Sequence, residues 1–255
     1  MFKYIIMNTT VIINVYKRWY SLEEQVKAYE NQSVKPREII IFQNEDSLYD
    51  IPKWILEKHK VIRSNFNWWV RFRFTVWLNV ITEYINIVDD DTIPWIRWLE
   101  NCEKCMSKVE WLYWTVWHIY KDRVKRSPQM ARPWRTQPNT KTVYADIIWH
   151  SWFLKRDWLK YFFSETIPCN TRPYNWEDIW LSYQLQKQWI PTLIAPHPCY
   201  DRQMRGSLKW NEYWWDKNAN CIWKGREYQD ARKYILDKWF KILVENEEFR
   251  KINKI

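Results

Sequence analysis

The chain has 255 residues, a formal net charge of +10 and 19% aromatic residues. This length suffices for one large hydrophobic core, or for one domain with an appendage, and the charge allows anionic partners such as a nucleotide, a nucleic acid or a membrane surface. No apolar run reaches the length of a spanning helix, and polar residues at positions 8–10 interrupt the N-terminal apolar stretch, which excludes the plan of a signal peptide. We therefore expect a soluble, cytoplasmic chain, with membrane association limited to peripheral contact.

The five cysteines are an odd number in a sizeable chain without a secretory signal, and this favours free thiols over disulfides. Cys102 and Cys105 have the spacing of a metal-ligand pair. No second pair follows them, so the sequence does not favour a zinc site, which takes four ligands.

The first 95 residues alternate apolar, β-branched runs with amphipathic spans, which predicts strands alternating with helices. Ser21 and Glu24 have the spacing of a capping box at the start of the first helix. Helix-length connections require parallel strands, so we expect an α/β fold with a Rossmann-like, mostly parallel sheet flanked by helices. The strands are predicted at residues 10–16, 38–42, 60–63 and 84–88, and the helices at 21–31, 51–58 and from about 74 to 82.

The last of these strands ends in three consecutive carboxylates, Asp89, Asp90 and Asp91. Open α/β sheets bind ligands at the carboxyl ends of their strands, and three neighbouring acids repel one another unless a cation or a donor-rich ligand compensates them. The alternative is an acidic turn that begins the next helix, with Asp91 or Thr92 as N-cap and Pro94 in the first turn. Both interpretations stay open at this point.

Two later segments combine basic residues with a distinct pattern. Residues 121–141 are rich in Lys and Arg and contain three prolines, which predicts either a mobile loop near a binding site or a merely solvated connection. Residues 227–249 carry apolar side chains at helical spacing with basic residues between them. This pattern predicts a C-terminal helix that packs on the core or lies on a membrane surface, and packing is the favoured interpretation.

The composition is abnormal in one respect, because the chain has 2 Gly and 22 Trp, whereas average usage gives about 18 Gly in a chain of this length. Several Trp residues stand where turn chemistry favours Gly, which alone reaches positive φ cheaply. Our hypothesis is that the gene comes from a source that reads UGA as glycine and was translated with UGA as tryptophan. The suspect positions are Trp68, Trp69, Trp95, Trp176 and Trp189, and the candidates for true tryptophans are Trp98, Trp152 and Trp158.

Several motifs in order resemble the GT-A-fold, family-2-type glycosyltransferases over roughly residues 10–208. In the first half these are a strand followed by Tyr16-Lys-Arg18, the segment Pro36-Arg-Glu-Ile-Ile-Ile41, an Asn-rich turn before Arg71, and the acid-tipped strand Tyr84 to Asp91. In the second half they are Asp146 to Phe153, Trp176-Glu-Asp-Ile179, which resembles a Gly-Glu-Asp-Ile segment at a helix start, and Ile190 to His197. The Trp residues depart from the pattern of the family.

The resemblance implies a metal-dependent enzyme that moves a sugar, with inversion, from a nucleotide-diphosphate sugar to the hydroxyl of a carbohydrate or other acceptor. It implies Mn²⁺ or Mg²⁺ as cofactor and no nucleic-acid partner. Residues 1–208 would form the glycosyltransferase domain, with a nucleotide-sugar half (1–95) and an acceptor half (96–208), and residues 209–255 a helical extension.

The diphosphate leaving group needs a divalent cation held by hard oxygen ligands, and Asp91 is the favoured ligand. Asp89 is expected at the ribose or at a metal-bound water, with Asp90 between these roles. By resemblance, His197 supplies a further metal ligand, although a polar residue after a buried strand is an equal alternative.

The nucleotide itself would be held by residues that follow the first strands: Tyr16 and Arg18 would line it, and Glu45 or Asp46 would accept from a base N–H. The Asn-rich turn contributes Asn67, and Arg71 or Arg73 would reach the pyrophosphate. Either arginine has an alternative role in an ion pair on the sheet surface.

Glu177 and Asp178 open a predicted helix, whose positive dipole end favours ionised carboxylates. This position suits a general base that takes the proton of the attacking hydroxyl. By resemblance, Asp178 is the base and Glu177 positions the acceptor, while ordinary acids at a helix start are the structural alternative.

Two other classes of function compete with this interpretation. A basic, aromatic-rich chain also fits a nucleic-acid-binding module, but that reading leaves the acid-tipped strand and the Glu177-Asp178 pair unexplained. A glycosyltransferase-like fold that binds without catalysis is the third reading.

Overall fold

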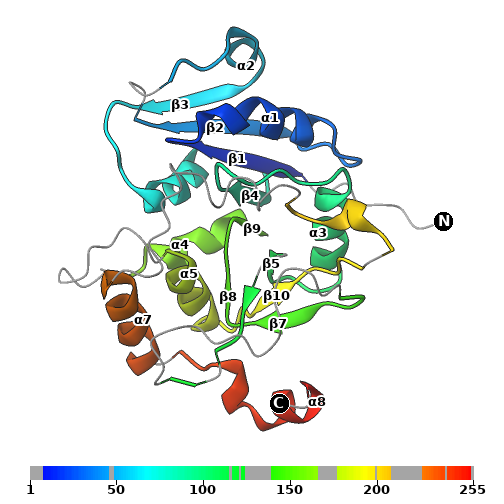
Figure 1. Ribbon diagram of the computed structural model, residues 1–255, viewed down its shortest axis with the longest axis vertical. Coiled ribbons are helices and arrows are strands. Elements are labelled where there is room, and N and C mark those ends of the chain that lie inside the picture. Colours follow the sequence, from blue (N-terminus) through cyan, green and yellow to red (C-terminus); the bar gives the residue numbers. More distant parts are fainter. Residues whose placement is uncertain are drawn as a thin grey trace.

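The computed structural model describes residues 8–45, 49–114, 117–120, 122–123, 139–165, 177–198, 200–207, 226–238 and 240–253. Its centre is a mixed sheet in the order β3-β2-β1-β4-β9-β5-β10-β7, with a short two-stranded sheet β6-β8 beside it. Helix α1 lies over β1 and β2, and α3 and α5 lie on opposite sides of the central strands (Figure 1). The expectation of an α/β fold with helices flanking a mostly parallel sheet is confirmed at this level.

The N-terminal half follows the predicted alternation of strands and helices closely. Strands β1, β2 and β3 pair in parallel, and β4 pairs in parallel with β1, because each connection between them contains a helical crossover. All residues of β1 and β4 are buried, as their unbroken apolar runs require. The elements are β1 (Thr9–Val15), α1 (Leu22–Glu30), β2 (Glu38–Asn44), α2 (Lys53–Lys58), β3 (Lys60–Ser64), the 3₁₀-helix η3 (Val70–Asn79) and β4 (Tyr84–Val88).

Two local predictions in this half are wrong. The expected helix up to residue 82 is the 3₁₀-helix η3, in which the buried side chains of Arg73 and Val76 are three residues apart, the spacing that aligns side chains in a 3₁₀-helix. Ser21 is the N-cap of α1 but its side chain makes no capping bond. Its hydroxyl donates instead to the carbonyl oxygens of Arg18, at 2.8 Å, and of Asp90, so it ties the start of α1 to the acidic loop.

The second half completes the sheet with antiparallel pairs, which make the mostly parallel sheet a mixed one. Strand β9 is antiparallel to β4 and β5, and β10 is parallel to β5 but antiparallel to β7. The bounds of these strands are β5 (Leu112–Trp114), β6 (Trp117–His118), β7 (Val143–Ala145), β8 (Ile147–Ile148), β9 (Ser151–Lys155) and β10 (Thr192–Ile194).

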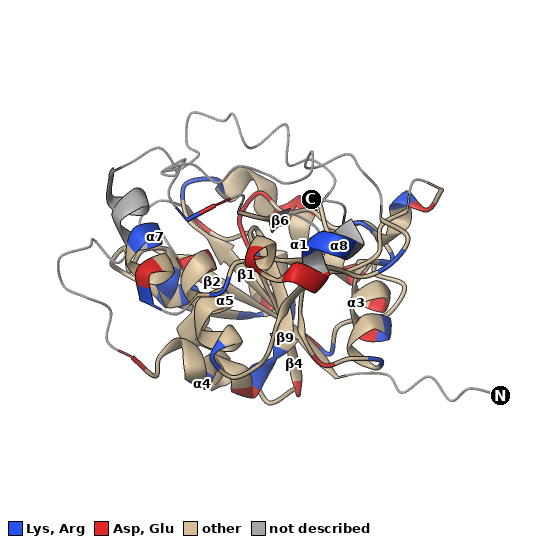
Figure 2. Ribbon diagram, turned by 90° about the horizontal axis from the view of Figure 1, so that it is seen from below, with Lys and Arg blue, Asp and Glu red and all other residues tan. Residues whose placement is uncertain are grey.

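The helices of this half surround the sheet, and one hydrophobic cluster joins them to the strands of both halves. Helices α3, α7 and α8 carry both Lys or Arg and Asp or Glu residues along their length (Figure 2). The elements are α3 (Trp98–Met106), η4 (Arg156–Trp158), α4 (Leu159–Phe162), α5 (Glu177–Gln186), η5 (Arg202–Met204), α7 (Arg226–Lys238), η6 (Leu243–Glu245) and α8 (Glu247–Asn253). Among the described residues, no helix combines the length and the apolar character that crossing a membrane requires.

The C-terminal extension packs on the core, as the favoured interpretation of its pattern predicted. The side chains of Ile235, Leu236, Phe240 and Ile242 belong to the core cluster. The predicted single helix over 227–249 is divided into α7, η6 and α8. Asp146 holds the extension in place, because its two carboxylate oxygens accept hydrogen bonds from the backbone N–H groups of Tyr120, at 2.7 Å, and Leu243, at 2.8 Å.

The tryptophans divide into two structural groups. Trp98 and Trp152, two of the three expected true tryptophans, are fully buried in the core. Trp69 has φ 63° and ψ −177°, a region that is populated almost only by glycine, and Trp189 has φ 60° with 88% of its surface exposed. Trp68 and Trp95 are not among the residues with positive φ, and Trp176 lies outside the described residues. The structure therefore supports a glycine preference at positions 69 and 189, but not at 68 and 95.

We predict that Trp69→Gly raises the free energy of unfolding by about 1 to 3 kcal/mol, because it relieves a backbone conformation that a Cβ disfavours. Urea unfolding of the variant measures this gain. Trp68→Gly is the matched control, since Trp68 itself does not have a positive φ and the change removes the stacking of Trp68 on Phe72. Equal effects of the two substitutions, or a loss of stability in Trp69→Gly, would contradict the prediction.

Candidate functional site

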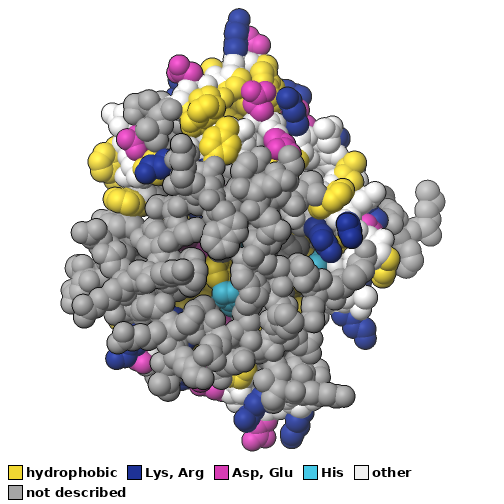
Figure 3. Space-filling view, viewed as in Figure 1, with side chains coloured by type: hydrophobic (Ala, Val, Ile, Leu, Met, Phe, Trp, Pro, Cys, Tyr) yellow, Lys and Arg dark blue, Asp and Glu magenta, His cyan; other side chains and the backbone are white. Residues whose placement is uncertain are grey.

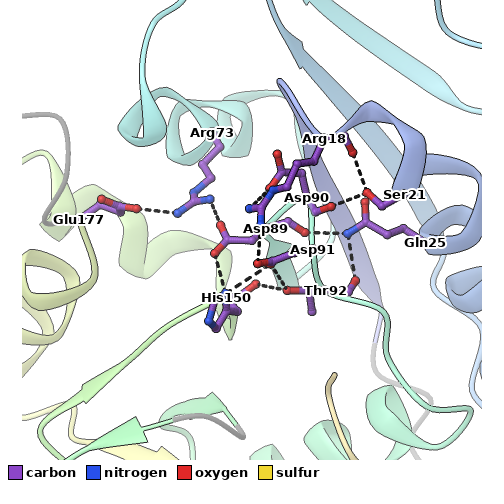
Figure 4. Close-up of polar contacts among 10 residues, drawn as sticks. All are labelled: Arg18, Ser21, Gln25, Arg73, Asp89, Asp90, Asp91, Thr92, His150 and Glu177. Atoms are coloured by element: carbon purple, nitrogen blue, oxygen red, sulfur yellow. Dashed lines mark hydrogen bonds and ion pairs between the residues drawn. The ribbon is translucent and has the colours of Figure 1, made fainter. Parts of the chain in front are cut away.

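The three acids Asp89, Asp90 and Asp91 directly follow β4, at the carboxyl end of the parallel strands β1 and β4. Arg18 follows β1 and reaches them from the neighbouring strand (Figure 4). Its guanidinium donates to Asp91 Oδ2 at 2.9 Å and to a carboxylate oxygen of Asp90. Arg18 was expected to line the nucleotide. In this structure its guanidinium instead neutralises part of the acidic cluster.

His150 completes the cluster from the opposite side. It directly precedes β9, which runs antiparallel to β4 with Ser151 opposite Val88, and its carbonyl oxygen accepts from the backbone N–H of Asp89 at 2.8 Å. Its Nδ1 lies 3.2 Å from Asp89 Oδ2 and 3.3 Å from Asp91 Oδ1. The φ of His150 is 69°, so its backbone is left-handed at the residue directly before β9.

Asp89, Asp91 and His150 each offer a ligand atom, and these atoms all lie within 4.8 Å of one another. Burial disfavours the charged form of His150, but the carboxylates of Asp91 and Asp89 outweigh it and raise the pKa of His150 to about 10. Burial likewise opposes ionisation of Asp91, but His150 and Arg18 outweigh it and hold the pKa of Asp91 well below its usual range. The carboxylates of Asp89 and Asp91 are thus ready to bind a cation, whereas His150 must lose a proton to become a ligand.

Arg73 links this cluster to the second half of the chain. Its side chain is only 3% exposed, one Nη donates to a carboxylate oxygen of Asp89, and the other donates to Glu177 Oε1 at 2.7 Å. The guanidinium carbon lies 4.6 Å from the ring centroid of Trp152, so an indole covers its face. Arg73 is therefore buried between two carboxylates, whereas the sequence alternative placed its ion pair on the sheet surface.

Glu177 and Asp178 begin α5 next to Arg73. Burial raises the pKa of Glu177 to about 7 against the opposing effect of Arg73. Burial, together with the charges of Glu177 and Asp89, raises the pKa of Asp178 well above its usual range. Asp178 Oδ1 is enclosed and has no hydrogen-bond partner within the described residues. Of the two acids, Glu177 is thus fixed by an ion pair, whereas Asp178 has an uncommitted oxygen.

The structure also brings several predicted nucleotide residues together at the ends of β1 and β2. Asn67 Nδ2 donates to the hydroxyl of Tyr16 at 2.9 Å, and Asn44 Nδ2 donates to Asn67 Oδ1 at 3.0 Å. Glu45 lies close enough to raise the pKa of Tyr16, after the larger effect of burial. Asp46 lies outside the described residues.

Two predicted residues are placed differently from the expectation. His197 is not in the metal-ligand group of the described residues; its Nδ1 lies 3.1 Å from the carbonyl oxygen of Ala195, a contact set by the loop after β10. Arg71 lies beside α4, with its guanidinium carbon 5.1 Å from the ring centroid of Phe162. Burial lowers the pKa of Arg71 to about 10, and Glu177 opposes that effect. Cys102 and Cys105 are buried free thiols, as predicted.

Sequence reasoning missed His150 as a candidate ligand, although it recognised the segment that contains it. The only signal was a histidine between Trp149 and Ser151, directly before a strand. Neither the φ of His150 nor the antiparallel pairing of β9 with β4 is visible in the sequence. Arg73 was weighed as a pyrophosphate contact or a surface ion pair, and its role between Asp89 and Glu177 depends on contacts across 104 residues of sequence.

A scan of protein-family models finds none that matches this chain, and a search of curated proteins finds no relative. On the face shown in Figure 3, a histidine side chain is visible near the centre, next to hydrophobic side chains.

We predict that Arg73→Met lowers the free energy of unfolding by about 3 to 5 kcal/mol, because it removes the cation that pairs with the buried Glu177 and one of the two cations that contact Asp89. Urea unfolding measures the loss. The matched control is Arg97→Met, which also removes an arginine held by two acids, Glu100 and Asp201, but at 33% exposure. Exposed pairs contribute about 0 to 1 kcal/mol, so similar losses for both variants would contradict the burial argument.

Proposed function

We propose that this protein is a metal-dependent glycosyltransferase of the GT-A-fold, family-2 type, which moves a sugar with inversion from a nucleotide-diphosphate sugar to an acceptor hydroxyl. The observation that carries the proposal is the position of the Asp89, Asp91 and His150 group at the carboxyl end of a central strand, joined through Arg73 to Glu177 at the start of α5. This arrangement puts a cation-binding group and a pair of candidate bases on one connected cluster. The ordered motifs of the sequence add support.

The chemistry of the donor set fits a divalent cation such as Mn²⁺ or Mg²⁺, since two carboxylates supply hard oxygen ligands and an imidazole is compatible with Mn²⁺. When bound, the cation would neutralise the charge that develops on the diphosphate leaving group. Asp91 and Asp89 would hold it, with His150 in place of the expected His197. Arg18, which contacts Asp90 and Asp91, is close enough to this cluster to donate to a phosphate oxygen instead.

The acceptor hydroxyl would lie beside the start of α5. There Asp178 would accept its proton, because its uncommitted Oδ1 and raised pKa make its carboxylate form a strong proton acceptor. Glu177, held by Arg73, would position the acceptor. At the other end of the site, Tyr16, Asn67 and Glu45 would contact the nucleotide.

The nucleic-acid-binding alternative has less support, because it gives no role to the linked acids Asp89 and Glu177 that Arg73 joins, which a nucleic-acid surface does not need. The non-catalytic alternative predicts nucleotide binding without sugar transfer. Turnover measured with a panel of nucleotide-sugars, with and without Mn²⁺, distinguishes it from the proposed enzyme.

We predict that Asp91→Asn weakens Mn²⁺-dependent binding of uridine or guanosine diphosphate at least tenfold, because an amide keeps the shape of the side chain but loses its charge. Calorimetry in Mn²⁺ and in EDTA measures the affinities. Asp201→Asn is the control, since Asp201 pairs with Arg97 outside the cluster. Equal affinity in Mn²⁺ and in EDTA for the unmodified protein would exclude metal-dependent nucleotide binding.

We predict that Asp178→Asn lowers turnover by about 10² to 10⁴ while donor affinity stays nearly unchanged, because general-base assistance has this magnitude and the carboxylate faces the acceptor side. Glu177→Gln should affect turnover less and the KM for the acceptor more. Steady-state kinetics and donor Kd for both variants decide the matter. If Glu177→Gln loses turnover and Asp178→Asn keeps it, the roles are exchanged; if neither changes, α5 carries no catalytic group.

A further inference from the structure

A polar cavity lies at the opposite edge of the sheet from the acidic cluster. It has a volume of about 390 Å³ and is lined by the segments that enter β2 and β3. Its charged lining consists of the cations Lys35, Arg37, Lys58 and Lys60, the acids Glu30 and Glu38, and His59. Since β2 has seven residues, its two ends are about 20 Å apart, so the cavity is a site of its own.

The parallel pairing of β2 and β3 creates the cavity. In their register Lys60, the first residue of β3, lies opposite Ile40 near the start of β2. The connection from α1 and the single residue between α2 and β3 therefore arrive at the same edge (Figure 1). Both deliver basic residues, and the backbone of Arg37 is fixed there by a hydrogen bond from its N–H to the carbonyl oxygen of Thr9, at 2.9 Å.

Few of these cations are neutralised by the protein. Lys58 Nζ and His59 Nε2 both contact Glu30 Oε1, at 2.6 and 2.8 Å. Lys35 and Lys60 donate to backbone carbonyl oxygens, those of Glu30 and Asn79, respectively. Among the residues that the structure describes, no hydrogen bond or ion pair engages the guanidinium of Arg37, which is exposed. Four cations against two carboxylates leave the cavity with a formal charge of +2.

We propose that this cavity binds a phosphate monoester. Its volume falls at the lower end of the range of small-molecule sites, about 300 to 1,000 Å³, and its net charge matches a phosphate monoester, which carries about −1.5 to −2 at pH 7. The free fork of Arg37 suits two oxygens of one phosphate group, and the lysines add point charges around it. A concave basic surface also concentrates the attracting field. The phosphate belongs either to a free small molecule or to the headgroup of an acidic lipid.

The test uses glycerol 3-phosphate as the soluble probe and phosphatidylcholine vesicles with phosphatidic acid as the lipid probe, both in EDTA. Arg37→Gln and Lys60→Gln are each expected to raise the Kd about tenfold in an NMR titration, because each removes a charge-assisted contact. Lys53→Gln is the matched control: Lys53 belongs to α2, is 88% exposed and pairs with Glu57 away from the cavity. Asp91→Asn should leave the affinity unchanged, since it alters only the acidic cluster.

Each outcome has a definite reading. Binding of glycerol 3-phosphate that depends on Arg37 and Lys60 supports the site with a soluble ligand. Flotation with the phosphatidic acid vesicles alone, lost in the same two variants, supports it with a lipid headgroup. The proposal fails if neither probe binds, if the Arg37 and Lys60 variants bind as the unmodified protein does, or if binding depends on Asp91. Because no sugar transfer is measured, failure here leaves the proposed glycosyltransferase activity unaffected, and the reverse is also true.

Discussion

The centre of this structure depends on the neutralisation of a group of enclosed carboxylates by a smaller set of cations. Two like charges at 4 Å repel by about 4 kcal/mol at an effective dielectric constant of 20, and burial adds several kcal/mol for each ion. Arg18, Arg73 and His150 offset these costs through direct contacts. The carboxylates are Asp89, Asp90, Asp91, Glu177 and Asp178. Since Arg73 contacts acids on both sides, it joins the two halves of the site.

The members of this cluster come from five separate parts of the chain, so only the complete sheet can assemble it. Arg18 follows β1, Arg73 belongs to η3, His150 precedes β9 and Glu177 begins α5, while the three aspartates follow β4. Asn86, in the middle of β4, supports this arrangement, because its side chain forms hydrogen bonds with Tyr29, Ser151 and Trp98. The preorganisation of the site therefore rests on the same buried polar bonds that fix the register of the central strands.

The sequence was sufficient for the first half of the fold, because β1 to β4 are short apolar runs separated by helical spans, and such a pattern permits little besides a parallel sheet. The acid-tipped strand is one of these runs, whereas the pair at the start of α5 was found through the resemblance of its segment to Gly-Glu-Asp-Ile. The role of His150 could not be predicted, because its position depends on the antiparallel pairing of β9 with β4. In that pairing Ser151 lies opposite Val88, which is 63 residues earlier in the sequence. The capping box at Ser21 failed because the hydroxyl found a tertiary partner, which a local motif does not reveal. The positive φ of Trp69 and Trp189 agrees with the turn positions predicted to favour glycine. Trp68 and Trp95 lack a positive φ, so a Trp near a predicted turn does not by itself indicate a position that favours glycine.

The separation of an acidic and a basic site on opposite edges of the sheet follows from the parallel topology. Parallel strands have all their carboxyl ends at one edge, so the helices that return the chain end at the other edge. The negative dipole ends of α1 and α2 thus lie beside the starts of β2 and β3, where they favour cations, and Lys35 donates to the last carbonyl of α1. This dipole effect accounts for Lys35 and Lys58, which stand at helix ends. It does not account for Arg37 and Lys60, which enter the strands, and these two cations therefore distinguish a ligand site from an ordinary basic helix terminus.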